Sequence, residues 1–113
     1  MTEGSYVPDA GDVVWLMFDP QAGHEQAGRR PALVLSPASY NGKSGLMVCC
    51  PMTTKIMGYP FEVVTDVDGV ENAVLSDQLK SFDWQARKAT KKAEVSRDAL
   101  GQARAKIKAL LVI

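Results

Sequence analysis

Short apolar runs, separated by glycine, proline and polar residues, recur along the first two thirds of the chain. The first spans Asp12–Phe18 between Gly11 and Asp19-Pro20, and its length with its valine and aromatic content favours a buried strand. Runs of the same character lie at Pro31–Ser36, Leu46–Cys50, Phe61–Val64 and Ala73–Leu75. The pattern predicts five short strands joined by hairpin-length links, which indicates a small, strongly curved antiparallel sheet or barrel.

Three polar segments between these runs, and a fourth after the last run, have a predicted form. Asp19–Gly28 reads as a long hairpin loop, and Ser39–Gly45 as a polar loop with room for one short helical turn. Residues 65–72 are expected to form an acidic turn around Gly69. Ser81–Ala86 fits a helical turn and a loop equally well.

The C-terminal segment has the clearest helical pattern. Ser96 is a plausible N-cap, and Asp98 falls in the first turn. The apolar positions at helical spacing are Leu100, Ala103, Ile107 and Leu110. Gly101 costs this helix about 1 kcal/mol relative to alanine, so packing against the sheet must stabilise it. The apolar end, Leu110–Ile113, suits a dimer contact and helix-to-sheet packing equally well.

The length of 113 residues predicts a single domain covering residues 1–113. With 46% hydrophobic and 23% charged residues, the composition excludes a disordered or collagen-like chain. Thirteen basic and thirteen acidic residues cancel, yet residues 62–77 are acidic and residues 80–92 are basic. Both runs fit a solvated surface, and the basic one also fits a groove for a phosphate backbone.

Cysteine and histidine are too few for most metal and redox chemistry. Cys49 and Cys50 are adjacent, which makes a disulfide between them very unlikely on geometric grounds, and with one histidine they make a structural zinc site improbable. We therefore expect no structural zinc site and name no cofactor, although carboxylates can hold a harder ion. No signal-peptide pattern and no apolar run near 18 residues is present, so we expect a cytoplasmic protein.

The segment Asp19–Pro37 holds the strongest candidates for chemistry. Glu25 lies in the predicted loop, five residues from Arg30, and across a hairpin mouth the two supply a base and a permanent cation. An exposed ion pair worth well under 1 kcal/mol is the alternative. His24 has no second histidine for acid–base chemistry and is at most an auxiliary substrate contact.

Two strand ends carry further candidates. Thr53 and Thr54 can bind an oxyanion or merely satisfy turn backbone groups. Asp77 and Lys80, which flank Gln78, can meet a nucleotide or form a loop ion pair. Of the two tryptophans, Trp15 is expected in the core and Trp84 at the surface, where it can stack on a base. The motifs GxxxxGK[ST], GxGxxG, HExxH and GxSxG are absent.

Four long, ordered stretches cover nearly the whole chain. They are YVPDAGDVVW at Tyr6–Trp15, FDPQAGHEQAGRRPALVLSP at Phe18–Pro37, CPMTTKIMGYPFEV at Cys50–Val63 and LSDQLKSFDWQAR at Leu75–Arg87. On these residues the chain resembles the MazF/PemK-type toxins, the endoribonuclease members of bacterial type II toxin–antitoxin pairs.

The resemblance implies a mainly β fold: a small SH3-like barrel of the CcdB–PemK type, with short helices, a C-terminal α-helix and assembly as a homodimer. It implies a sequence-specific, metal-independent endoribonuclease that cleaves single-stranded mRNA and arrests growth. It also implies a MazE-like antitoxin whose acidic segment covers a basic groove; the expected contacts are Lys80, Arg87, Lys88 and Lys91. A non-enzymatic toxin that binds a protein target, as CcdB binds gyrase, and a plain RNA-binding module are the alternatives.

The family's loop acid matches Glu25, its catalytic arginine Arg30 and its active-site threonine Thr53. The further substrate contacts expected are His24, Arg29, Thr54, Asp77, Gln78, Lys80 and Arg87. In the implied reaction Glu25 accepts the 2′-OH proton, Arg30 neutralises the phosphorane and Thr53 holds a non-bridging oxygen. The products are a 2′,3′-cyclic phosphate and a 5′-OH. Met17 and Arg29 stand where close relatives can have an acid and a histidine, which affects the recognition sequence.

Overall fold

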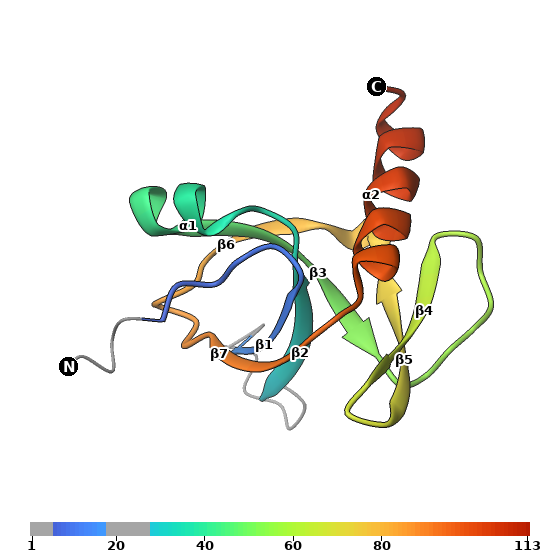
Figure 1. Ribbon diagram of the computed structural model, residues 1–113, viewed down its shortest axis with the longest axis horizontal. Helices are drawn as coiled ribbons and strands as arrows, with labels where there is room; N and C mark the ends of the chain where they lie inside the picture. The colour runs from blue at the N-terminus through green and yellow to red at the C-terminus, as the bar shows by residue number, and fades with distance from the viewer. Residues whose placement is uncertain (1–5, 18–27) are drawn as a thin grey trace.

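Seven strands form one curled antiparallel sheet in the order β4-β5-β3-β2-β1-β7, and β6 pairs with the free stretch of β3 (Figure 1). The computed structural model describes residues 6–17 and 28–113. The strands are β1 (Asp12–Met17), β2 (Arg29–Val34), β3 (Leu46–Thr53), β4 (Glu62–Val67), β5 (Val70–Leu75), β6 (Lys80–Asp83) and β7 (Thr90–Glu94). The helices are α1 (Ala38–Ser44), the short 3-10 helix η3 (Ser76–Gln78) and α2 (Arg97–Leu111). The sequence prediction of a mainly β, strongly curved fold with a C-terminal helix is confirmed.

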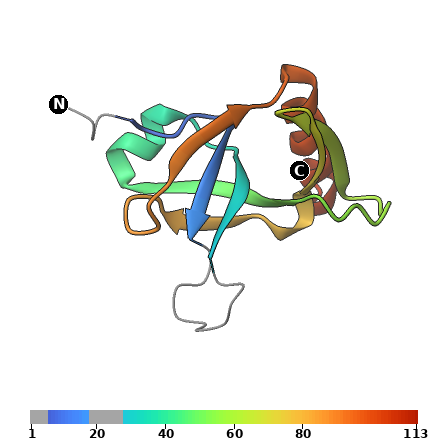
Figure 2. The same cartoon turned by 90° about the horizontal axis from the view of Figure 1, so that it is seen from below.

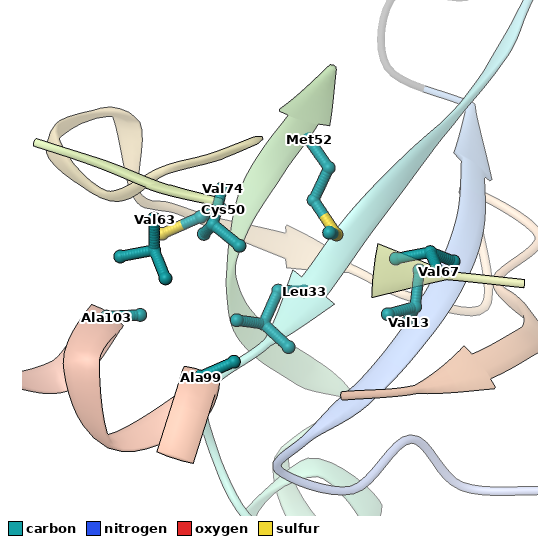
Figure 3. Packing of buried hydrophobic residues seen from close by; sticks show 9 residues of the cluster. All are labelled: Val13, Leu33, Cys50, Met52, Val63, Val67, Val74, Ala99 and Ala103. Atoms are coloured by element: carbon teal, nitrogen blue, oxygen red, sulfur yellow. The ribbon is translucent and has the colours of Figure 1, made fainter. Parts of the chain in front are cut away.

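Two apolar clusters form on the opposite faces of the sheet. The helix-side cluster, which includes α2 residues, consists of Val13, Leu33, Cys50, Met52, Val63, Val67, Val74, Ala99 and Ala103 (Figure 3). The Trp84 cluster consists of Val14, Leu16, Ala32, Val34, Met47, Cys49 and Trp84. In Figure 1, α1 and α2 lie at opposite ends of the molecule.

Strand alternation explains the two clusters. Val13 pairs with Leu33 of β2, and Leu33 pairs with Cys50 of β3; all three belong to the helix-side cluster. Cys49 precedes Cys50 and belongs to the Trp84 cluster, because neighbouring side chains on a strand point to opposite faces. Both thiols are free and buried, and burial raises the pKa of each to about 12.

Helix α2 begins and packs as the sequence predicts. The Ser96 hydroxyl accepts a hydrogen bond from the Ala99 amide at 3.0 Å, and Ala99 and Ala103 are buried against the sheet. Leu110–Ile113 are exposed, and Val112 reaches 87% exposure. Packing of the helix on the sheet therefore does not account for this apolar end.

Three strands differ from the prediction: β5 begins earlier than predicted, and β6 and β7 were not predicted. Val70 opens β5 after the two-residue turn Asp68-Gly69, whose φ angles are 52° and 83°, so the acidic turn is much shorter than residues 65–72. The segment Ser81–Ala86, interpreted as a helical turn or loop, instead holds most of β6 followed by a turn, and β7 had no prediction. Strands β6 and β7 are rich in polar and charged residues, so neither contains an apolar run that would predict a strand.

The two tryptophans occupy the reverse of their predicted environments. Trp84 is only 7% exposed, and its Nε1 donates to the Asn41 carbonyl of α1 at 2.9 Å. Trp15 is half-buried, although its neighbours Val14 and Leu16 on β1 are fully buried. The prediction that Trp84 is an exposed stacking residue is wrong, because the turn after β6 folds it under α1.

Candidate active site

Arg30 and Thr53 lie near each other at one end of the sheet. Arg30 is the second residue of β2, and Thr53 is the last residue of β3. The two strands pair antiparallel with Ala32 opposite Pro51, so continuing this register by two residues brings Arg30 opposite Thr53. Figure 2 shows the ends of β1 and β2 at the edge where the chain passes into residues 18–27. The sheet thus holds a cation and a hydroxyl on adjacent strands.

Two surface hollows meet at this pair. The Trp15 hollow, of about 370 Å³, includes Trp15, Arg30, Thr53, Thr54, Asn72 and Lys92 in its lining. The Tyr59 hollow, of about 220 Å³, includes Arg30, Thr53, Lys55, Tyr59, Glu62 and Gln78. Because Arg30 and Thr53 line both, an extended ligand bound across the pair would have a hollow on either side.

The Thr53 hydroxyl is positioned by the turn that follows β3. Its Oγ accepts a hydrogen bond from the Lys55 amide at 3.0 Å. The hydroxyl therefore satisfies a turn backbone group, which was one of the two roles open to it from the sequence. Since an oxygen that accepts one bond still carries its own proton, Thr53 keeps a donor for a ligand oxygen.

Glu62 organises the segment between β3 and β4. Its carboxylate accepts from the amides of Met57, Gly58 and Tyr59, with Gly58 at 2.7 Å. The Tyr59 hydroxyl donates to Asp77 Oδ2, and this hydrogen bond raises the pKa of Tyr59. These contacts fasten the wall of the Tyr59 hollow to η3.

Asp77 keeps one unsatisfied oxygen beside the same wall. Its Oδ1 is buried and has no hydrogen-bond partner among residues 6–17 and 28–113. Buried polar atoms of folded proteins are nearly always paired, so this acceptor stands out. The next residue, Gln78, is exposed and lines the Tyr59 hollow, where it offers a hydrogen-bonding group.

The other predicted site residues lie outside the described part of the chain or at separate places on the sheet. Glu25 and His24 lie outside the described residues. Arg29 donates to the Thr90 hydroxyl and its guanidinium lies 5.7 Å from the centre of the Trp15 ring.

Arg87 has a visible structural role. Its Nη1 donates to the Met17 carbonyl at 3.0 Å, and its guanidinium stacks 4.7 Å from the Phe82 ring centre. It therefore ties the turn after β6 to the end of β1. Lys80 is exposed on β6, and Thr54, also exposed, lines the Trp15 hollow.

Side chains of the basic run at residues 80–92 line more than one hollow. Lys88 and Lys91 line a separate hollow with Tyr6 and Trp84. Lys91 is also engaged by Glu94 at 2.6 Å and Asp12 at 3.6 Å. Lys92 alone of this run lines the Trp15 hollow.

Sequence reasoning missed most residues of the Trp15 hollow, among them Trp15, Asn72 and Lys92. Trp15 lies inside an apolar run, and Lys92 lies in a charged run that reads as solvated surface. Asn72 falls within the segment interpreted as a turn. The dipeptide Asp68-Gly69 was the available signal, because Asp-Gly between β-forming residues is typical of a two-residue hairpin and would have placed Asn72 on a strand.

The described residues contain no group of three or more His, Cys, Asp or Glu side chains able to hold a metal ion. Within the same residues, no helix has the length and apolar character required to cross a bilayer. The groups that the described site offers for chemistry are the guanidinium of Arg30 and the Thr53 hydroxyl, which line both hollows.

Comparison with known proteins gives consistent results for sequence and structure. The family of PemK-like, MazF-like toxins of type II toxin–antitoxin systems matches residues 9–111. The Endoribonuclease toxin MazF of Escherichia coli K12 is 52% identical over 106 residues, which cover 94% of this chain and 96% of that protein. The Endoribonuclease toxin ChpB of the same strain is 35% identical, with 70% of this chain and 72% of that protein covered.

The crystal structure of MazF from Deinococcus radiodurans superposes with a TM-score of 0.86 at 55% identity, covering 96% of this chain and all 100% of that one. A MazE–MazF crystal structure from the same organism superposes with a TM-score of 0.83 at 50% identity, covering 95% and 97%. The matches span the sheet, both helices and the Arg30–Thr53 edge. The chain belongs to the family of PemK-like, MazF-like toxins of type II toxin–antitoxin systems.

Proposed function

We propose that this toxin cuts single-stranded mRNA at short sequence motifs by metal-independent attack of the 2′-OH on the adjacent phosphorus. The chain is an endoribonuclease, as are the toxins that it resembles in sequence. The observation that carries the mechanism is the junction of the two hollows at Arg30 and Thr53. A phosphate lying there would meet a permanent cation and a hydroxyl donor, with room for a nucleotide on each side.

Each group has a defined task in this reaction. Glu25 accepts the proton of the 2′-OH, and the oxygen forms its bond to phosphorus. Arg30 neutralises the additional negative charge of the phosphorane, and Thr53 donates a hydrogen bond to a non-bridging oxygen. The bond from phosphorus to the 5′-oxygen then breaks, and that oxygen takes up a proton. The products are a 2′,3′-cyclic phosphate and a 5′-OH.

The remaining predicted residues bind substrate on the flanks. Asp77 binds on one of these flanks, since its Oδ2 accepts from the hydroxyl of Tyr59, which lines the Tyr59 hollow. Gln78 acts beside it in the Tyr59 hollow. Thr54 contributes to the Trp15 hollow. The other proposed contacts to RNA are His24, Arg29, Lys80 and Arg87.

A cleavage assay with two arginine variants tests this proposal. Wild-type protein is incubated with a long RNA in EDTA, and the 5′ ends are mapped and tested for phosphorylation by a kinase. We expect discrete 5′-OH ends, and a loss of roughly 10²–10³ in rate for Arg30→Ala. Arg97→Ala, an exposed arginine in the first turn of α2, is the matched control and retains wild-type activity. Equal activity of the two variants would contradict the role of Arg30.

The antitoxin is the natural protein partner, since relatives with the same fold crystallise as MazE–MazF complexes. We place both proteins in the cytoplasm, where mRNA is available. An acidic antitoxin segment is expected to contact Lys80, Arg87, Lys88 and Lys91, so added salt should weaken the complex. An affinity that does not change with salt would contradict this contact.

The assembly proposed for the toxin is a homodimer with a single folded domain, residues 1–113, in each copy. The exposed apolar end of α2, Leu110–Ile113, is the candidate contact because the sheet does not cover it. Light scattering should give the mass of a dimer for wild-type protein. Leu111→Lys should lower that mass, and a dimer unaffected by the substitution would place the contact elsewhere.

A further inference from the structure

The Trp15 hollow extends beyond the two residues that it shares with the Tyr59 hollow. Its volume of about 370 Å³ lies within the range typical of small-ligand sites, about 300–1,000 Å³. Apolar side chains form much of its lining, namely Trp15, Pro31, Met52, Val67 and Val70. Met52 and Val67 are almost fully buried and belong to the helix-side cluster (Figure 3), so they form a firm base.

Asn72 supplies a positioned polar group in this apolar setting. It is 5% exposed, and its Nδ2 donates to the Val70 carbonyl at 3.1 Å. That bond uses one of the two amide protons, and it is the hydrogen bond that the side chain makes within the described part of the chain. The second proton and the amide oxygen remain for a ligand in the hollow that Asn72 lines.

A strand irregularity brings Lys92 into the same lining. Val13 pairs with Ala93 and Val14 pairs with Lys91, so Lys92 is an extra residue on β7 without a partner on β1. Such bulges re-aim side chains, and Lys92 Nζ lies 4.9 Å from the centre of the Trp15 ring.

The same ammonium closes the hollow against the β4–β5 turn. Lys92 Nζ lies 3.0 Å from Asp68 Oδ2, and both residues line the hollow. The pair joins β7 to the β4–β5 hairpin, which are at opposite ends of the sheet order. A ligand in the hollow is thus bounded by charges on one side and by Arg30 and Thr53 on the other.

We propose that the Trp15 hollow is a nucleobase subsite, which holds the base of a nucleotide next to the scissile phosphate and reads it through the Asn72 amide. This subsite rests on the proposed ribonuclease function. A flat base fits the apolar lining, and the donor and acceptor of a carboxamide match the polar edge of a base. Asn72 is therefore a specificity-determining residue, with Trp15 and Lys92 as the side chains that enclose the base.

The cleavage profile of Asn72→Asp tests the reading of the base. The carboxylate keeps the size of the amide but loses its donor, so base preference should change by roughly 5- to 100-fold at one position beside the cut. Glu71→Gln, on the exposed face of the same strand, is the control and keeps the wild-type profile. An Asn72→Asp enzyme that cuts with unchanged preference at every position overturns the subsite.

Tryptophan fluorescence tests occupancy without any need for cleavage. The probe is a short oligonucleotide that contains the cleavage motif, with 2′-deoxyribose at the cut position. Since Trp84 is buried in the opposite cluster, a saturable change in emission should come from Trp15 and vanish in Trp15→Phe. Binding detected by anisotropy with no change in Trp15 emission overturns the subsite, as does failure to bind at all. Saturable quenching together with uncut RNA would contradict the nuclease function and leave the subsite standing.

Discussion

Buried polar groups differ in their hydrogen bonding between two regions of the molecule, α1 with its surroundings and the Tyr59 hollow that Arg30 lines. Under α1, Asn41 is fully buried, donates to the carbonyls of Pro8 and Ser36 at 2.7 and 2.9 Å, and accepts from the Ser36 hydroxyl at 2.6 Å. Its own carbonyl accepts from the Trp84 indole. In η3, whose Gln78 lines the Tyr59 hollow with Arg30 and Thr53, Asp77 by contrast keeps a buried oxygen without a partner in the described residues.

The difference separates groups that hold the fold from groups that remain available to a ligand. A closed hydrogen-bond network stabilises one conformation, and a buried acceptor that no protein group pairs carries a free-energy cost. The two tryptophans differ in burial in a similar way, since Trp84 is 7% exposed within its cluster and Trp15 is half-buried in the lining of the Trp15 hollow. Substitutions in the first region should reduce stability, and those in the second should reduce activity.

Trp84→Ala should cause the largest loss of stability. It leaves a cavity in the Trp84 cluster and deprives the Asn41 carbonyl of its donor, and removal of a buried tryptophan costs about 3–5 kcal/mol. Urea denaturation followed by circular dichroism measures the free energy of unfolding. Trp15→Ala is the comparison and should cost less, because its ring is half-buried. Equal losses would remove the distinction between the two regions.

Thr53→Val should reduce activity much more than stability. The substitution preserves the shape of the side chain and removes the donor proposed for the phosphate, so the cleavage rate should fall by roughly 10²–10³. The loss of the hydrogen bond from the Lys55 amide should cost about 1 kcal/mol. Thr65→Val on β4 is the control. A Thr53→Val enzyme with the wild-type rate would show that the Thr53 hydroxyl only accepts the hydrogen bond of the turn after β3 and does not bind the phosphate.

Alkaline pH should destabilise the protein through the two buried thiols. The pKa of Cys49 and of Cys50 rises from 9.0 in the unfolded chain to about 12, because burial disfavours the thiolate. The contribution is fully present below pH 9 and is lost as the pH rises toward 12, by about 1 kcal/mol per thiol at pH 10.

Denaturation at several pH values measures this effect. Cys49→Ala should flatten the alkaline slope relative to the wild-type protein by less than half, because Cys50 and Tyr6, whose pKa is also raised by burial, contribute to the same slope. A free energy of unfolding with no dependence on pH between 9 and 11 would contradict the burial of both thiols.

Asp68→Asn should have the smallest effect on stability. Asp68 is exposed in the β4–β5 turn, and its ion pair with Lys92 is worth well under about 1 kcal/mol in solvent. Thermal unfolding at low and high salt measures the pair, and both proteins should agree at high salt. A loss of several kcal/mol in the free energy of unfolding would show that this ion pair stabilises the fold by joining β7 to the β4–β5 hairpin.

The central strands could be predicted from the sequence because each buries side chains on one or both faces. The apolar runs of β1, β2 and β3 identify these strands, and the cap at Ser96 identifies the start of α2. Strands β6 and β7 could not be found in this way. Their residues are mostly polar, so their pairing with β3 and β1 depends on tertiary structure.

The site could be predicted in part. Arg30 and Thr53 come from the resemblance to a toxin family, and the strand register brings the two to one edge. Asn72 and Lys92 reach the Trp15 hollow through a two-residue turn and a bulge, which local periodicity does not reveal. Trp15 was assigned to the core because an apolar run does not show which of its side chains will line a surface hollow.

The most direct test of the mechanism is a pair of oligonucleotides that differ by one oxygen atom. Both contain the cleavage motif, and one has 2′-deoxyribose at the nucleotide whose 2′-OH should attack. In EDTA, the account predicts cleavage of the all-RNA strand to a 2′,3′-cyclic phosphate and a 5′-OH, and no cleavage of the deoxy-substituted strand. Equal cleavage of the two strands would contradict attack by the 2′-OH and with it the roles assigned to Glu25, Arg30 and Thr53.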